Sequence, residues 1–284
     1  MRVLPYLAVI LIGVMTSCNI INPKEEIPTY IYIDSFHVQS VATSVHGSTS
    51  NKITDAWVYM NNDIVGVYEL PAKIPLIIKD PNTALTISAG IWDNGISGLR
   101  VRYPFYRLSE HTLSPSPGNV IPLTPITTYN TNAKFHLIED FEQGNSFVKF
   151  LGDTNLFRTT DPTYVFEGTN SGLVIMTNTK RGTQMITAEK LKLPGDMQSY
   201  MEINYRGNVD FTIKAQVTKS GQPVVTGDIL SVKERSSWNK IYVNLTPYGT
   251  AYPGSDFNFI LTVGLPEGKT DGYLAIDNFK VVSF

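Results

Sequence analysis

One cysteine, Cys18, is the residue whose chemistry the sequence defines best. It follows a basic residue, Arg2, an apolar run over residues 3–15, and two small polar residues, Thr16 and Ser17. A charged start, a short apolar middle and small residues before a cleavage point are typical of a secretory signal. The apolar run is shorter than the roughly 20 residues that span a bilayer. A thiolate at its end is a nucleophile able to form a thioether.

Residues 15–18 (MTSC) resemble a lipobox, the motif at which bacterial lipoproteins are cut and acylated. The resemblance implies that residues 1–17 are a cleaved signal peptide and that Cys18 carries a diacylglycerol and an acyl chain such as palmitate. Each buried methylene contributes about 0.8 kcal/mol, so a stable anchor needs two or three chains. The alternative is an ordinary signal with an accidental cysteine. Because no second cysteine exists, no disulfide can form within the chain.

Residues 18–28 form the expected tether, with two prolines and no periodicity. Within it, residues 24–26 (KEE) are similar to the basic-then-acidic signal that sends some lipoproteins to the outer face of the outer membrane. The alternative is a solvated linker. The sequence thus predicts a protein anchored in the outer membrane by lipid, with the periplasmic and external leaflets both left open.

Catalytic groups are sparse. Asp140 and Glu142 are the one pair of acids that a strand would place on the same face, since neighbours such as Glu139 point the opposite way. Their spacing matches no glycosidase motif, and the common hydrolase, metalloprotease and nucleotide-binding motifs are absent from the sequence. The four histidines have no metal-ligand spacing: His37, His46, His111 and His136. These observations predict that the protein is not an enzyme.

The composition is that of a globular, near-neutral protein. Of 284 residues, 42% are hydrophobic and 17% charged, with 23 Lys and Arg against 25 Asp and Glu. Such a balance gives no electrostatic attraction for nucleic acid, which excludes that class of partner. Fifteen Tyr, 13 Phe, 21 Gly and 17 Pro indicate a β-rich chain with many turns.

The first half shows the period of two that strands require. Alternation begins at residues 30–34 and continues at residues 56–60 and 64–68, which flank a turn at residues 61–63 (NND). Residues 39–54 are expected to be a long loop, and residues 120–128 a final strand. Four segments resemble the small PEGA-type β-sandwich of envelope proteins: residues 56–59 (AWVY), 64–66 (IVG), 69–71 (ELP) and 85–90 (LTISAG). The resemblance implies a β-sandwich over residues 29–130, with residues 129–132 as a linker, and no shared chemistry.

The second half contains about eight short strand-like runs separated by Gly, Pro and Asp turns, which predicts a sandwich or jelly roll. Five segments look like the galactose-binding-like jelly rolls: residues 139–142 (EDFE), 171–172 (SG), 201–206 (MEINYR), 237–245 (SWNKIYVNL) and 275–281 (AIDNFKV). The resemblance implies a jelly roll over residues 133–284 and, since many carbohydrate-binding modules belong to that group, a carbohydrate ligand.

The same resemblance implies a structural calcium ion. Asp140, Glu142 and Asp277 occupy the positions at which such jelly rolls hold the ion, and calcium takes oxygen ligands. The alternative is that Asp140 and Asp277 cap strand ends and pair with backbone or with Lys280. No other cofactor is required.

Sugar binding would use aromatic faces beside polar groups. The best-placed aromatics are Tyr248 and Tyr252 in a Pro/Gly loop, Trp238 before a strand, and Trp92 in a loop of the first half. Each also has the alternative of packing in the core.

The fold class that follows is all-β, with two β-sandwich domains in tandem after a cleaved lipoprotein signal peptide. The expected function is carbohydrate or surface-ligand binding by the jelly roll of a lipid-anchored envelope protein. The alternative is a non-catalytic accessory subunit of an outer-membrane protein complex, which would use its sheet faces for docking.

Overall fold

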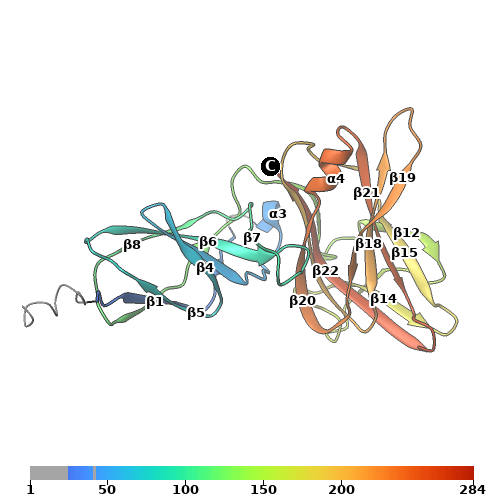
Figure 1. Cartoon of the computed structure of the whole chain (residues 1–284). Coiled ribbons are helices and arrows are strands. Elements are labelled where there is room, and N and C mark those ends of the chain that lie inside the picture. Colours follow the sequence, from blue (N-terminus) through green and yellow to red (C-terminus); the bar gives the residue numbers. More distant parts are fainter. Residues whose placement is uncertain (1–24, 41–42) are drawn as a thin grey trace, which may run out of the picture.

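The computed structural model describes residues 25–40 and 43–284, which form two groups of β-strands with little helix (Figure 1). The fold is all-β, as the sequence predicts. In the described part of the chain, the two groups of strands share no sheet, and one isolated bridge, between Asp93 and Tyr242, joins them. We call β1–β10 the first domain and β11–β22 the jelly roll.

The first domain is a sandwich of short strands around one apolar core. Its elements are β1 (Thr29–Ile33), β2 (His37–Val38), α3 (Thr43–His46), β3 (Asp55–Met60), β4 (Asp63–Glu69), β5 (Ala72–Leu76), β6 (Thr83–Trp92), β7 (Arg100–Arg102), β8 (Ser109–Leu113), β9 (Val120–Pro122) and β10 (Ile126–Thr127). A three-stranded sheet, β5-β1-β9, packs against a five-stranded sheet, β4-β3-β6-β7 with β8 also beside β6. A separate pair, β10-β2, completes the domain.

The predicted hairpin is present as β3 and β4. Asn61 and Asn62 form its turn with φ angles of 50° and 72°, which asparagine tolerates because its side chain is short and polar. Two expectations were wrong in detail. The expected loop over residues 39–54 contains α3, and the expected strand over residues 120–128 is divided into β9 and β10.

The jelly roll is two six-stranded sheets. Its elements are β11 (Lys134–Glu139), β12 (Phe147–Gly152), β13 (Phe157–Thr159), β14 (Ser171–Thr177), β15 (Gly182–Thr187), β16 (Leu191–Lys192), β17 (Ser199–Gly207), β18 (Phe211–Thr218), β19 (Val225–Val232), β20 (Arg235–Asn244), α4 (Thr246–Ala251), β21 (Asp256–Gly264) and β22 (Asp271–Ser283). One sheet has the order β13-β14-β22-β17-β20 with β11 beside β22, and the other has β12-β15-β21-β18-β19 with β16 beside β21.

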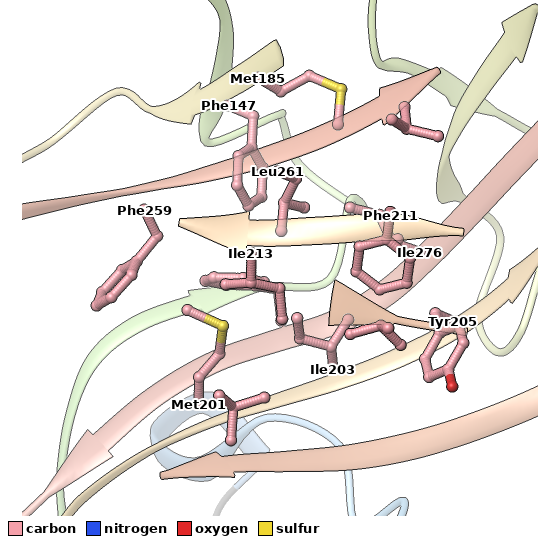
Figure 2. Packing of buried hydrophobic residues seen from close by; sticks show 14 of the residues in the cluster. Phe147, Met185, Met201, Ile203, Tyr205, Phe211, Ile213, Phe259, Leu261 and Ile276 are labelled. Carbon is pink, nitrogen blue, oxygen red and sulfur yellow. The ribbon is translucent and has the colours of Figure 1, made fainter. Parts of the chain in front are cut away.

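Apolar side chains from the two sheets meet in the middle of the jelly roll. Figure 2 shows Phe147 and Met185 above the layer of Ile213, with Met201 and Ile203 of the facing sheet below it. All five belong to one buried cluster, and the period of two sends their neighbours in sequence to the outer faces.

The first domain covers the outer face of β17, β20 and β22. Tyr200, Tyr242 and Val282 of that face belong to the core of the first domain rather than to that of the jelly roll. Tyr129, which lies in the predicted linker, is 3% exposed within the same cluster. The two domains are therefore joined by a buried interface, and the segment between them is part of it.

Candidate ligand-binding groove at the domain junction

A groove of about 780 Å³ lies where the two domains meet. The first domain supplies most of its lining, including Trp57, Arg102 and Arg107, and the jelly roll adds Gln198 and Phe284. Concave sites of roughly 300–1,000 Å³ are the usual size for small-molecule binding. The groove is therefore the candidate functional site, and we call it the junction groove.

Strand alternation places Trp57 at this groove. Its neighbours Ala56 and Val58 are fully buried in the first domain, so the side chain between them points to the outer face of the sheet. A Cβ atom at Gly90 of β6 would lie 2.9 Å from both Cδ1 and Nε1 of Trp57. The edge of the indole thus lies directly over Gly90, where any larger residue would displace it. Glycine at position 90 allows the ring to lie close against the sheet.

Arg100 also lines the groove, but its guanidinium already pairs with two carboxylates of the first domain. Its guanidinium pairs with Asp55, which is fully buried, and its Nη2 lies 2.7 Å from Oε2 of Glu69. Hydrogen bonding to Glu69, followed by that to Asp55, raises the pKa of Arg100. This arginine therefore ties β7 to β3 and β4 rather than offering a free charge.

Arg102 and Arg107 differ from Arg100 because both are exposed and neither forms an ion pair among the described residues. The guanidinium carbon of Arg102 lies 6.0 Å from the ring centroid of Tyr59, on the same sheet face as Trp57. Glu110 of β8 is also exposed and unpaired in the described chain, and it lines the same groove. The groove thus offers an aromatic surface beside free donors and one free carboxylate.

The wall of the groove is held by a buried network that crosses the domain interface. Tyr103, which lines the groove, donates a hydrogen bond from its hydroxyl to Oε1 of Glu202 at 2.6 Å. The hydroxyl of Tyr129 donates to the same oxygen at 2.8 Å, and Nζ of Lys240 lies 2.7 Å from Oε2. Nζ of Lys280 lies 3.4 Å from the hydroxyl of Tyr129. Two tyrosines of the first domain are therefore fixed to charged groups of the jelly roll.

The charges of this network follow from its geometry. Burial by itself would raise the pKa of Glu202, but the ammonium groups of Lys240 and Lys280 more than compensate and lower it to about 2. Burial, followed by the charge of Glu202, raises the pKa of Tyr103 well above its usual range. The carboxylate is thus ionised and Tyr103 is a protonated donor at neutral pH.

Trp92 and Trp238, two of the predicted ligand-binding residues, lie in different places. Trp92 ends β6 and is half-buried, with Nζ of Lys52 5.3 Å from its ring centroid. It borders a second groove of about 330 Å³ between the domains. Trp238 lies within β20, not before a strand, and packs against Phe166 with 5.2 Å between ring centroids.

The sequence predicted an open loop for Tyr248 and Tyr252. In the structure Tyr248 lies in α4 and Tyr252 is the C-cap residue of that helix. Pro247 occupies the first turn of this helix, a position that favours helix because proline has no N–H to satisfy there. Both tyrosines are half-buried against the core, and the hydroxyl of Tyr248 donates to the carbonyl of Asp228 at 3.1 Å. None of the four predicted aromatics lines the junction groove.

The predicted calcium ligands are not brought together. Strand β11 ends at Glu139, and Phe141 has a φ of 59°, so Asp140 and Glu142 do not share a strand face. Oε1 of Glu142 accepts hydrogen bonds from the backbone N–H groups of Thr169, at 2.7 Å, and Asn170, at 2.9 Å. These bonds lower the pKa of Glu142, and the bond from Asn170 has the larger effect.

Asp277 lies in a different environment. It is 1% exposed and accepts hydrogen bonds from the hydroxyl of Ser171 at 2.6 Å and from the N–H of Asn278 at 2.7 Å, while burial raises its pKa to about 7. Within residues 25–40 and 43–284, no three His, Cys, Asp or Glu side chains are grouped to hold a metal. Each of these carboxylates accepts N–H or O–H donors of the protein, and Glu142 and Asp277 do so from the consecutive residues Asn170 and Ser171, so the calcium site stays a prediction. Because Asp140 and Glu142 do not share a strand face, the basis for a glycosidase pair is absent.

Trp57, Arg102 and Arg107 were not predicted as site residues. A signal for the first was present, because the alternation in residues 56–59 (AWVY) places Trp57 and Tyr59 on the face opposite Ala56. The arginines gave no comparable signal. Arg102 comes near Trp57 through the pairing of β6 with β7, and Arg107 lies in the segment between β7 and β8.

The predicted lipidation site, Cys18, lies outside the described residues. In the part of the chain that the structure describes, no helix is long and apolar enough to cross a membrane.

No protein-family model matches the sequence, and no curated protein matches it. The solved structures that resemble part of the chain include several carbohydrate-binding modules. TmCBM61 in complex with β-1,4-galactotriose has 12% sequence identity and a TM-score of 0.35, with 52% of this chain and 97% of that chain covered. The family 11 module of cellulosomal cellulase Lic26A-Cel5E of Clostridium thermocellum has 15% identity and a TM-score of 0.36, with 52% of this chain and 93% of that chain covered. The CBM22-1–GH10 modules of endo-1,4-β-D-xylanase 10B of Clostridium thermocellum, complexed with xylohexaose, have 13% identity and a TM-score of 0.41. The match covers 53% of this chain and 28% of that chain.

Proposed function

We propose that this protein is a non-enzymatic carbohydrate-binding lipoprotein and that the junction groove is its binding site. The observation that carries the proposal is the indole of Trp57, held over Gly90 on the sheet face and bordering a groove of about 780 Å³. The partly exposed indole of Trp57 offers an apolar surface on which a pyranose ring can stack, and neighbouring polar groups fix the orientation of the sugar. The jelly roll contributes through Gln198 and Phe284, which complete the groove.

A binding role suits the groove better than a catalytic one. Glycoside hydrolysis needs two carboxyl groups on either side of the scissile bond. Among the described residues, Glu110 is the one side-chain carboxylate that lines the groove. Glu110 is also exposed, whereas the general acid of a glycosidase is typically held in an apolar pocket.

We also propose that lipid on Cys18 anchors the protein in the outer membrane. Ten residues, 19–28, lie between Cys18 and Thr29 at the start of β1, a span of at most about 35 Å. Figure 1 shows β1 at the end of the first domain that lies away from the jelly roll. This arrangement would hold the first domain near the bilayer and direct the jelly roll away from it.

A glycan array with the purified full chain tests the carbohydrate assignment. We expect hits that Trp57→Ala reduces at least tenfold, because the stacking surface is removed. The matched control is Trp238→Ala, since Trp238 is also half-buried but lies outside the groove. An array without hits, or hits that depend on Trp238 and not on Trp57, would contradict the proposal.

One observation favours the accessory-subunit alternative. Four large apolar side chains are 44–56% exposed on the edge strands β12 and β13 of the jelly roll: Val148, Phe150, Leu151 and Phe157. Exposed apolar edges of this kind often mark protein-binding surfaces. Stoichiometric capture of an outer-membrane protein by the full chain, abolished by Leu151→Asn and combined with an empty glycan array, would support that function instead.

A further inference from the structure

We infer that the junction groove selects carboxylated saccharides, with Arg102 and Arg107 binding the carboxylate while Trp57 stacks on the ring. This inference rests on the proposed carbohydrate-binding function and names the ligand class. It follows from the distribution of charge around the groove.

The free side-chain charge of the groove is positive. The side chains that line it include three arginines and one acid, Glu110, although the chain as a whole has 23 basic and 25 acidic residues. Asp55 and Glu69 neutralise Arg100, which leaves Arg102 and Arg107 exposed and unpaired in the described part of the chain.

Arginine is the side chain best suited to this task. Its planar guanidinium donates two parallel hydrogen bonds to a carboxylate, and such charge-assisted bonds are about twice as strong as neutral ones. A neutral sugar would use the same arginines only through hydroxyl groups and would leave their charge without a partner.

Glu110 adds a hydrogen-bond acceptor to the groove. Its carboxylate repels a second carboxylate and accepts hydrogen bonds from hydroxyl groups. A bound uronate would therefore place its carboxylate on Arg102 and Arg107 and offer hydroxyl groups to Glu110.

The test uses the purified full chain with oligomers of galacturonate, glucuronate and mannuronate, each beside its carboxyl-reduced neutral counterpart. We expect at least one acidic oligomer to bind tenfold or more tightly than its neutral counterpart, and binding to weaken as salt is added. Arg102→Gln and Arg107→Gln should each remove about tenfold of the acidic affinity and lower the neutral affinity by less, so that the preference for the acidic oligomer narrows. The control is Arg235→Gln, an exposed arginine that borders the smaller groove.

Equal binding of acidic and neutral oligomers, weakened by Trp57→Ala, would overturn acidic selectivity and leave the proposed function intact. Absence of binding to every saccharide, here and on the glycan array, would overturn both. Loss of acidic binding in Arg235→Gln but not in Arg102→Gln would place the selectivity in the other groove and overturn this inference. Because Arg102 and Arg107 are exposed, both variants should fold, which circular dichroism checks.

Discussion

The hydroxyl of Tyr103 and the carboxylate of Glu202, 99 residues apart in the chain, form a 2.6 Å hydrogen bond that joins the two domains. Glu202 is fully buried and also pairs with Lys240. Breaking a buried pair costs far more than losing an exposed one, because it leaves a charge without a partner. This bond therefore couples the wall of the junction groove to the stability of the whole protein.

Tyr103→Phe removes one donor from Glu202 and keeps the ring. We expect the free energy of unfolding to fall by roughly 1.5–3 kcal/mol, the usual range for a hydrogen bond to a charged group. Urea denaturation measures the loss. The matched control is Tyr32→Phe, because Tyr32 is exposed and its hydroxyl has no hydrogen bond among the described residues. Equal effects of the two variants would show that the interdomain bond contributes no stability.

Stability should depend on pH through Glu202. Its pKa is lowered from 4.5 to about 2 in the folded state, so its contribution is complete above pH 4.5 and is lost as the pH falls toward 2. We expect Glu202→Gln to be less stable than the natural protein at neutral pH, whereas a protonated Glu202 resembles glutamine. The difference in unfolding free energy between the two proteins should therefore shrink by roughly 3 kcal/mol across this window. A difference that stays constant with pH would contradict the lowered pKa.

Gly90→Ala should weaken saccharide binding without contacting the ligand. The new Cβ would lie 2.9 Å from the Trp57 indole and 2.8 Å from Cβ of Asp55, so the ring must move away from the sheet. We expect calorimetry to show at least a fivefold loss of saccharide affinity, because displacing a stacking ring costs about 1 kcal/mol of binding free energy. Gly98→Ala is the control, because no atom lies within 4 Å of its added Cβ. Unchanged affinity in Gly90→Ala would mean that the position of Trp57 is unimportant.

Cys18→Ser should release the protein from membranes. A hydroxyl is too weak a nucleophile to form the thioether, so the lipid cannot be attached. We expect cells fed radiolabelled palmitate to lose the label from the protein, which should then leave the membrane fraction. Ser17→Ala is the control, since it keeps a small residue before the cysteine. Label and fractionation that survive Cys18→Ser would refute the lipid anchor.

Chelation of calcium should leave the melting temperature unchanged. Asp140, Glu142 and Asp277 each already accept hydrogen bonds from protein groups, and among the described residues no three His, Cys, Asp or Glu side chains are grouped to hold a metal. Thermal unfolding with EDTA and with added calcium gives the comparison. A melting temperature that rises with calcium and no longer does so in Asp277→Asn would restore the original ligand assignment.

The sequence by itself determined the local structure. The period of two in residues 56–60 and 64–68, with asparagines between them, predicted the β3–β4 hairpin because alternation and left-handed turn conformations are local properties. Most apolar runs of the second half are strands for the same reason. Strand β19 shows no such pattern, because its apolar residues do not alternate regularly with polar ones and most of the strand is exposed.

Only the tertiary structure decided where the site lies. Trp57, Arg102 and Phe284 meet because β3 pairs with β6, β6 pairs with β7, and the end of the jelly roll packs against the first domain. The predicted linker residue Tyr129 is buried for the same reason, since Glu202 supplies its hydrogen-bond partner from across the interface. Strand register and domain packing are set by contacts between residues far apart in the chain, and a local pattern carries no information about them.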